Sequence, residues 1–476
     1  MGDGAAGGSN RTKPLLECHI DEYSRHSPVA DHLEVLHRLS GIESARQVSH
    51  GCARTTSMQL AILAEDQVRS GVETFRLVDD TIRREVLRRN GSTAMSSLSP
   101  PEPCLAPGLD RLFDKAWLTS TVAPPVSDPT GVVRVVDLFA GCGGLSLGVL
   151  EACRALQLEM WSVMANDIDP DALAIYGLNF PESHLVDEPI ESFLDSPTGE
   201  PLSASEQKLR RNLGDIDLVI GGPPCQGHSD LNNHTRNSDP KNELYLRMAR
   251  FCEVVKPRHV IIENVPGVER DRRRVAQRTW RLLTELGYKI DSGVVNAVSV
   301  GVAQRRKRSL TIASLEVSPN IPTAIADVGA EERDLRWAIE DLVATDHERI
   351  FDSPPTPNDT NANRIDFLFD NDLHELPDQQ RPDCHRLKEH TYVSVYGRLH
   401  WDRPAPTVTT GFGSMGRGRY VHPSERRTLT PHEAARVQFF PDFFDFGRSR
   451  RTLLQKTIGN AVPPKMGYAL GLHLLR

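Results

Sequence analysis

Paired cysteines and long apolar runs are missing from this sequence. Only 8 of its 476 residues are cysteine, and none forms a CxxC pair, which argues against a disulfide framework and against a zinc ribbon. No apolar run approaches the ~20 residues that a bilayer-spanning helix needs, and the first residues lack the apolar stretch of a secretory signal. We therefore expect a soluble, cytoplasmic protein without a metal site or a membrane partner.

Positive charge is scarce overall but unevenly distributed. The formal net charge is −8, which argues against a generally basic nucleic-acid-binding protein. A single basic run is usually a solvated surface, yet several runs in the second half of the chain make a basic groove the better interpretation. These runs are Arg270–Arg274, Gln304–Arg308, Arg417–Arg427 and Arg448–Arg451.

Residues 1–125 differ in pattern from the rest of the chain. From Ser57 to Asn90 apolar residues recur at three- and four-residue steps, which predicts a helix that Asn90 and Gly91 would cap. Residues 92–108 read as a linker, and Leu109–Leu118 predicts one more helix. We expect a helical N-terminal extension over 1–125 that packs on the next domain, self-associates through its helices or binds a partner.

After residue 130 strand-like and helix-like segments alternate. Strands are predicted at 132–140, 160–167, 215–222 and 258–265, with helices at 145–156, 170–180 and 241–255. This alternation indicates an α/β fold, a Rossmann-like parallel sheet with helices on both faces. The pattern loosens after 315 and becomes helix-like again near the C-terminus. We predict a larger domain over 130–315, a smaller domain over 316–427 and a return to the larger domain over 428–476.

A glycine-rich turn follows the first of these strands. Gly141, Gly143 and Gly144 allow a tight turn and let a ligand lie against bare backbone. Asp167 ends the next strand, where a carboxylate can accept both hydroxyls of a ribose. The third glycine is displaced from its place in the dinucleotide motif. The turn therefore favours a nucleoside-bearing cofactor without a pyrophosphate, such as S-adenosylmethionine, over NAD.

Cys225 lies in the segment GGPPCQG, on a loop after a short apolar strand. Most free cysteines are small buried hydrophobes, but Glu263 and Asn264 end the strand at 258–265, on the same edge of the predicted sheet. A thiol nucleophile and a carboxylic acid would then meet in one pocket.

A thiol, an acid and a methyl donor together fit one reaction on cytosine. Addition of a thiolate to C6, with an acid at N3, turns the ring into an enamine whose C5 can attack a sulfonium methyl. Loss of the C5 proton and elimination of the cysteine restore the ring. Because these atoms are hidden inside a duplex, the base must be flipped into the pocket.

Six segments, in order between residues 132 and 476, resemble motifs of the bacterial-type DNA (cytosine-5)-methyltransferase family. They are DLFAGCGG, GGPPCQG, ENVPG, QRRKR, RTLTPHEAARVQFFPD and GNAVPP. The resemblance implies an enzyme that transfers a methyl group from S-adenosylmethionine to C5 of cytosine in a specific double-stranded DNA sequence. It also implies a covalent bond between Cys225 and C6 of a flipped base.

The resemblance assigns roles by position. Cys225 would be the nucleophile, with Pro224 shaping its loop, and Glu263 would bind N3 and the exocyclic amine. Arg306 and Arg308 would contact the flipped nucleotide and the pocket, with phosphate contact alone as the equal alternative. Asp167 would bind the ribose of the cofactor, and Ile168 and Asp187 would lie at its adenine. The rest of the cofactor pocket would be lined by Phe139, Gly141, Gly143, Gly144, Asn460 and Val462.

The sequence departs from the family pattern after the nucleophile. His228 stands where a phenylalanine is usual, and Lys241, Asn242 and Glu243 replace an arginine and small residues. The resemblance implies that this loop closes over the DNA. Target recognition would fall within residues 317–427, where the loop Gly411–Arg419 can approach bases and phosphates closely.

Two other functions remain open at this level. A tRNA cytosine-5 methyltransferase would share the scaffold, although the sizeable recognition segment favours DNA. A catalytically silent DNA-binding relative would not need the intact PCQ and ENV segments. The expected partners are double-stranded DNA and cognate restriction or defence proteins, at the nucleoid.

Overall fold

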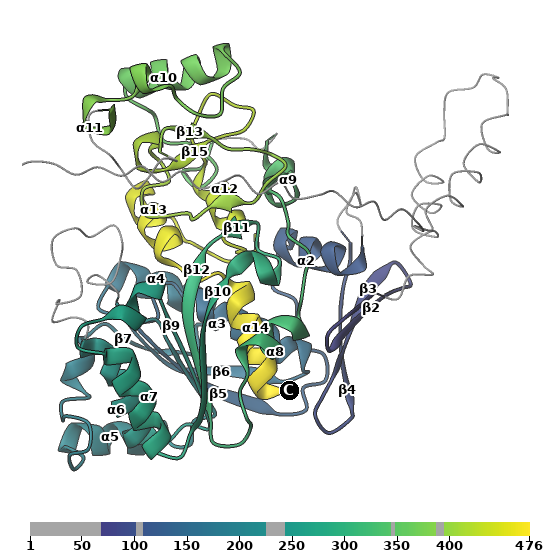
Figure 1. The fold of residues 1–476 in the computed structure, drawn as a ribbon. Helices are drawn as coiled ribbons and strands as arrows, with labels where there is room; N and C mark the ends of the chain where they lie inside the picture. Colours follow the sequence, from purple (N-terminus) through teal and green to yellow (C-terminus); the bar gives the residue numbers. More distant parts are fainter. Residues whose placement is uncertain (1–67, 101–107, 225–242, 344–347, 387–394) are drawn as a thin grey trace, which may run out of the picture. The chain divides into compact units, whose positions relative to one another are not determined.

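The computed structural model describes residues 68–100, 108–224, 243–343, 348–386 and 395–476 (Figure 1). All of them belong to one unit of the chain, Leu60–Arg476. Cys225, His228, Lys241 and Asn242 lie outside the described residues. Within the described part, no helix is both long and apolar enough to cross a membrane.

The centre of the larger domain is a seven-stranded sheet. Its strands are β5 (Val132–Leu138), β6 (Glu159–Asn166), β7 (His184–Val186), β8 (Leu218–Gly221), β9 (His259–Asn264), β10 (Lys289–Asn296) and β12 (Lys307–Ser314). Their order across the sheet is β10-β12-β9-β8-β5-β6-β7. β12 is antiparallel to both neighbours, and the other pairs are parallel. The predicted α/β fold is confirmed, although the sheet is mixed rather than wholly parallel.

Helices cover both faces of this sheet. α3 (Gly144–Ala155) and α14 (Pro464–Leu475) pack in a core with Val135 and Ile261. α6 (Tyr245–Val255) and α7 (Val275–Glu285) pack in a second core with Val136. The described chain also forms α4 (Pro170–Asn179), α5 (Ala204–Leu213), α8 (Ile321–Asp327), α9 (Leu335–Ile339), α12 (Pro431–Val437) and α13 (Arg451–Asn460).

α3 and α14 touch through their backbones, although they are far apart in the sequence (Figure 1). A Cβ added at Gly148 would lie 2.0 Å from the carbonyl oxygen of Pro464, and one at Gly467 would lie 2.7 Å from that of Leu145. Only glycine allows such an approach. The C-terminal helix is thereby fixed against the helix that begins at the glycine-rich turn.

The predicted helix over 57–90 is wrong in its described part. Four antiparallel strands form instead, β1 (Val68–Ser70), β2 (Glu73–Val78), β3 (Thr81–Leu87) and β4 (Thr93–Leu98). Ile82, Arg84 and Val86 are buried at alternate positions, which is the two-residue period of a strand. Asp79 and Asp80 both have positive φ and join β2 to β3, as in the type I′ turn of a hairpin. The helix predicted at 109–118 is confirmed as α2 (Leu109–Thr119).

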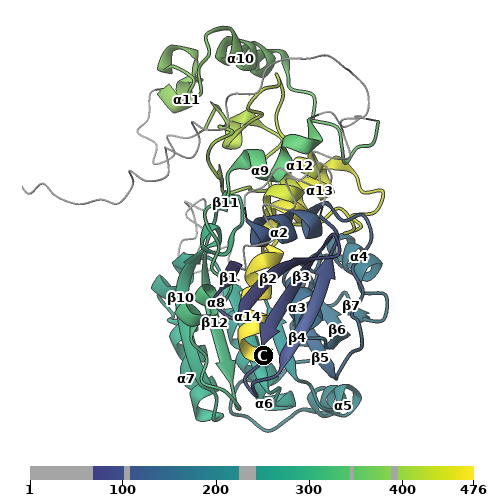
Figure 2. The same ribbon diagram turned by 90° about the vertical axis from the view of Figure 1, so that its right-hand side faces the viewer.

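The N-terminal sheet lies beside α3 and α14 (Figure 2). Arg84, on β3, forms an ion pair of 2.8 Å with Glu151 of α3 and donates a hydrogen bond of 3.1 Å to the Tyr468 hydroxyl of α14. That hydroxyl donates in turn to Glu73 of β2. All four side chains are buried. Buried ion pairs and hydrogen bonds therefore attach the N-terminal sheet to the larger domain.

A third, smaller core contains only residues of the segment predicted as the smaller domain. Its members lie on α10 (Asp359–Asp370), on β15 (Arg419–Val421) and near β13 (Gly397–Arg398), and they include Leu368, Met415 and Val421. α8, by contrast, packs against α14, where Asp327 contacts His473. The separate core thus begins later along the chain than residue 316.

Candidate functional site

An open cavity of about 1490 Å³ lies at the C-terminal ends of β5, β6, β8 and β9. The carboxyl ends of parallel strands are where open α/β sheets bind ligands. Most of the residues predicted for the site line this cavity: Phe139, Gly141, Gly144, Asp167, Ile168, Pro224, Glu263, Arg306, Arg308, Asn460 and Val462. Gly143 and Asp187 are not part of its wall, whereas Glu188 and Ile190 are.

The glycine-rich turn presents bare backbone to the cavity. Gly141 has a φ of +54°, and a Cβ added there would meet no atom within 4 Å. Gly143 is required for close packing, because a Cβ at this position would lie 2.9 Å from the rings of Tyr176 and Phe180. Gly141 therefore faces the ligand space, and Gly143 lets the turn pack on the core.

Asp167 holds the turn in place. Its two carboxylate oxygens each accept a hydrogen bond of 2.8 Å, one from the backbone N–H of Gly141 and one from that of Asp169. Burial raises the pKa of Asp167 above its usual value, although these two bonds oppose the shift. A carboxylate has about four acceptor positions, so Asp167 can still accept hydrogen bonds from the hydroxyl groups of a ribose.

Asp137 is a cavity residue that the sequence analysis did not select. It lies near the end of β5, is 1% exposed, and accepts a hydrogen bond of 2.6 Å from the Ser146 hydroxyl. Burial raises its pKa to about 8. An acidic residue ending an apolar strand was the available signal, the same signal that selected Glu263.

The start of the nucleophile loop lies against Glu263. Gly222 follows β8, and a Cβ added there would lie 3.4 Å from Oε2 of Glu263. The carbonyl oxygen of Pro223 accepts a hydrogen bond of 3.0 Å from the side chain of Asn264. Pro223 and Pro224 both line the cavity. Cys225 itself lies outside the described residues, but it follows Pro224 directly in the chain.

Glu263 is a buried carboxylate that forms an ion pair with one arginine. It is 8% exposed, and its Oε1 lies 2.6 Å from Nε of Arg308. This close ion pair favours the charged carboxylate and restrains its position. Oε2 remains on the side of Gly222 and the cavity. The group can therefore accept a hydrogen bond from an amine or, when protonated, donate one to a ring nitrogen.

Arg306 lies in the cavity wall but is only 1% exposed. Its guanidinium group donates hydrogen bonds of 2.8, 3.1 and 2.9 Å to the carbonyl oxygens of Val408, Gly459 and Ala461. It therefore links the smaller domain to the terminal motif.

Two buried glutamines complete this link and were not selected from the sequence. Oε1 of Gln304 accepts a bond of 2.8 Å from the backbone N–H of Val408, and its Nε2 donates to Gln438 at 2.8 Å. Gln438 donates to the carbonyl oxygen of Ile458 at 2.6 Å. Amides inside apolar or basic segments gave no distinct signal, because glutamine is usually a surface residue.

The wall opposite the sheet is formed by the smaller domain. Arg417 is exposed there, and its stem lies on Gly411, where a Cβ would be 2.3 Å from its Cδ. Arg419 is held by Glu375 at 2.6 Å. The His400 ring stacks on His374 with 3.8 Å between the ring centres. This wall offers two exposed cations, Arg403 and Arg417, and several stacked or paired side chains to a ligand in the cavity.

Comparisons with known proteins identify a matching family model and similar proteins. The family model described as C-5 cytosine-specific DNA methylase matches residues 133–476. The Type II methyltransferase M1.BsuMI of Bacillus subtilis (strain 168) is 44% identical over 420 residues, covering 88% of this chain and 98% of the relative. The Type II methylase M.HgiDII of Herpetosiphon aurantiacus is 28% identical over 358 residues, covering 72% of this chain and 96% of the relative.

A solved structure supports the fold. The S. pombe Dnmt2 methyltransferase superposes with a TM-score of 0.50 at 20% identity, covering 72% of this chain and 98% of that one. The match to M1.BsuMI covers 88% of this chain, which is more than residues 133–476 contain. That relative therefore shares part of the sequence that forms the N-terminal sheet and α2.

Proposed function

The chain belongs to the C-5 cytosine-specific DNA methylase family, and from this premise we propose that its cavity is where cytosine is methylated. The enzyme is a DNA (cytosine-5)-methyltransferase that acts on double-stranded DNA and uses S-adenosylmethionine as methyl donor. Which residues perform the reaction follows from the geometry of the cavity.

One observation carries the proposal. The backbone at Gly222 lies against the Glu263 carboxylate, and the same cavity contains the glycine-rich turn. The residues that lead directly to Cys225, Gly222 to Pro224, thus line one cavity with Glu263 and the glycine-rich turn. A thiol, a carboxyl group and a methyl donor are the three groups that methylation at C5 needs.

The residues of the cradle fit S-adenosylmethionine. Gly141 leaves open space, Asp167 has acceptor positions for ribose hydroxyls, and Ile168 is 69% exposed within the cavity, where its side chain can cover an adenine. Phe139, Gly144, Asn460 and Val462 complete the wall. When bound, the cofactor supplies an electrophilic methyl group on a sulfonium.

The protein residues then act on the cytosine. The Cys225 thiolate forms a bond to C6, and the electron pair of the C5–C6 double bond becomes available at C5 for attack on the methyl group. Glu263 holds N3 and the exocyclic amine, and Arg308 holds Glu263 in place. After methylation a water molecule takes the C5 proton, the C–H electron pair re-forms the C5–C6 double bond, and the sulfur–C6 bond breaks to release the free thiolate.

Methyl transfer from labelled S-adenosylmethionine tests this assignment. Wild-type protein is expected to label duplex DNA and not tRNA, whereas Cys225→Ser is expected to label neither. Phe139→Ala is expected to raise the KM for S-adenosylmethionine about tenfold or more, because an aromatic side chain buried against a ligand contributes about this much. Full activity of Cys225→Ser would refute the proposed nucleophile.

We further propose that the smaller domain reads the DNA sequence and that the enzyme modifies sites of a type II system, as the names of the relatives suggest. Arg417 is an exposed cation on the wall facing the sheet, as is Arg403, and arginine pairs with guanine through two hydrogen bonds. Bisulfite sequencing of DNA from cells that express the chain should reveal one methylated motif. Methylation spread over unrelated sequences would contradict a sequence-specific enzyme.

A further inference from the structure

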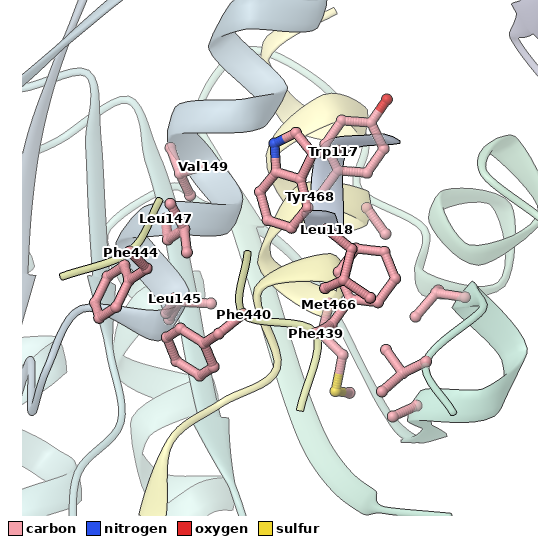
Figure 3. Close-up of a cluster of buried hydrophobic side chains, with 14 of the residues drawn as sticks. Trp117, Leu118, Leu145, Leu147, Val149, Phe439, Phe440, Phe444, Met466 and Tyr468 are labelled. Atoms are coloured by element: carbon pink, nitrogen blue, oxygen red, sulfur yellow. The ribbon is translucent and has the colours of Figure 1, made fainter. Parts of the chain in front are cut away.

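The N-terminal module, residues 68–119 with β1 to β4 and α2, precedes the family match at 133–476. It is nevertheless packed against the end of the chain. Trp117 of α2 stacks on Phe439 with 5.5 Å between the ring centres, close to Met466 and Tyr468 of α14 (Figure 3). The carbonyl oxygen of Leu118 accepts a hydrogen bond of 3.0 Å from the backbone of Asp442.

A buried carboxylate in this module joins two distant cations. Oδ1 of Asp114 accepts a bond of 2.7 Å from Nζ of Lys465, and Oδ2 pairs with Arg333. These three side chains are 5%, 7% and 1% exposed, respectively. Burial opposes ionisation of Asp114, yet the two cations lower its pKa below the usual value. Asp114 is therefore ionised. A neutral water molecule could not supply the negative charge that pairs with the two cations.

Lys465 needs this partner because of its position. It lies in the first turn of α14, immediately after Pro464, where the helix dipole disfavours a positive charge. Burial adds a desolvation cost, which the rings of Tyr468 and Phe439, 4.7 and 5.6 Å from the ammonium, offset in part and the Asp114 carboxylate offsets further. Without the Asp114 charge, the ammonium group is expected to move toward solvent and to carry the first turn of α14 with it.

The first turn of α14 is in contact with the cofactor cradle. A Cβ added at Gly144 would lie 2.5 Å from the carbonyl oxygen of Val462, and one at Gly148 would lie 2.0 Å from that of Pro464. Asn460 and Val462 line the cavity just before this turn. A shift of α14 would therefore move Val462 against the glycine-rich turn.

We propose that Asp114 is a positioning residue for the cofactor site, which holds the Asn460–Val462 segment in place through Lys465. This inference rests on the proposed cofactor cavity. It assigns to the N-terminal module a part in binding S-adenosylmethionine, although none of the module's described residues lines the cavity.

The test compares Asp114→Asn with a matched control, Glu206→Gln, in the full chain. Glu206, on α5, is also a buried carboxylate, and it forms an ion pair of 2.6 Å with Arg250 of α6. Glu206 does not line the cavity. Asp114→Asn is expected to raise the Kd for S-adenosylmethionine, measured by titration calorimetry without DNA, and the KM for this cofactor about tenfold, with the KM for DNA and the kcat at saturating cofactor within about twofold of wild type. Asp114→Glu should recover part of the loss, and Glu206→Gln should leave all of these constants unchanged.

A second variant keeps the test decisive if Asp114→Asn does not fold. Lys465→Met removes the buried ammonium and leaves Asp114 paired with Arg333. It should raise the same KM, and the double variant should raise it no further than the larger single effect, because the two residues act as one unit. An unchanged KM in either folded single variant, or an equal rise in Glu206→Gln, overturns the inference.

Failure of this inference is distinguishable from failure of the proposed cavity. If the cavity does not bind the cofactor, Phe139→Ala will leave the KM for S-adenosylmethionine unchanged. If only the role of Asp114 is wrong, Phe139→Ala will raise that KM while Asp114→Asn will not.

Discussion

At the scale of single residues, the proposed chemistry depends on one carboxylate. Glu263 is buried, held by Arg308 and directed at the start of the nucleophile loop. The sequence predicted Glu263 correctly as a residue of the cavity, because a carboxylate that ends an apolar strand faces the ligand edge of the sheet. It could not predict the arginine partner, since the pairing arises from the antiparallel placement of β12 beside β9.

Glu263→Gln keeps the shape of the side chain and removes its charge and acidity. We expect kcat to fall by about 10²- to 10⁴-fold, the usual contribution of a general acid, while DNA is still bound. Glu269→Gln is the matched control, because Glu269 accepts a bond of 2.9 Å from Ser309 of β12 but does not line the cavity. A comparable loss in both variants would show that the effect is structural.

His432 makes stability depend on pH. Its ring nitrogens each lie 2.8 Å from a carboxylate oxygen, one of Asp352 and one of Asp442. Burial alone would lower the pKa of His432, but these two bonds raise it above 6.5. Burial likewise opposes ionisation of Asp442, yet His432 and Arg436 lower its pKa to about 2, so this carboxylate stays charged from pH 5 to 9.

The direction in which stability changes with pH follows from the raised pKa of His432. The stabilisation by protonated His432 is fully present below about pH 6.5 and is lost as the pH rises through the folded-state pKa. The Tm of His432→Gln should therefore fall furthest below that of wild type near pH 5.5, by a few degrees, since ~1 kcal/mol shifts the Tm of a large domain by about 2 °C. Thermal melts from pH 5.5 to 9 check this, and a gap that widens with pH would be contradictory.

At the scale of elements, the sequence predicted the βα alternation well and the N-terminal sheet badly. Parallel strands buried on both faces are continuous apolar runs, as at Leu218–Gly221, and they stand out. In 73–98 the apolar residues fit both a helical stripe and a strand alternation. The turn at Asp79–Asp80 decides between them, and its type I′ geometry could not be read from two aspartates without the packing of β3 on α3.

Asp80→Gly separates the two structures experimentally. In the hairpin, Asp80 has a φ of +61°, which glycine adopts without strain, so the variant should be more stable by about 0.5–1 kcal/mol. In a helix the same substitution would cost about as much. Urea unfolding measures the difference, and a lower midpoint for Asp80→Gly would argue against the hairpin.

The crossing of α3 and α14 gives a second prediction at this scale. Gly148→Ala should destabilise the protein by about 1–3 kcal/mol or more through overpacking, although alanine favours helices. Gly177→Ala on α4 is the control, because its Cβ would meet a flexible leucine side chain, Leu185, at 2.8 Å rather than backbone. Equal stability of the two variants in urea would contradict the close backbone contact.

At the scale of the whole molecule, the site is assembled from segments that are distant in the sequence. The glycine-rich turn, the nucleophile loop, the acid and the terminal motif meet in one cavity, and Gln304, Arg306 and Gln438 bond its parts together. The ordered motifs predicted which segments take part. They could not predict the buried links between them, because such polar pairs depend on the three-dimensional packing.

The central claim is that the loop carrying Cys225 meets the flipped cytosine in the cavity beside Glu263. The most direct measurement uses duplex DNA with 5-fluorocytosine at the methylated site, because a fluorine at C5 cannot leave as a proton does and the covalent adduct persists. With S-adenosylmethionine present, we expect a denaturation-resistant complex whose digest yields the DNA adduct on the peptide containing Cys225. An adduct on another peptide, or no covalent complex on a duplex that the enzyme methylates, would contradict the account.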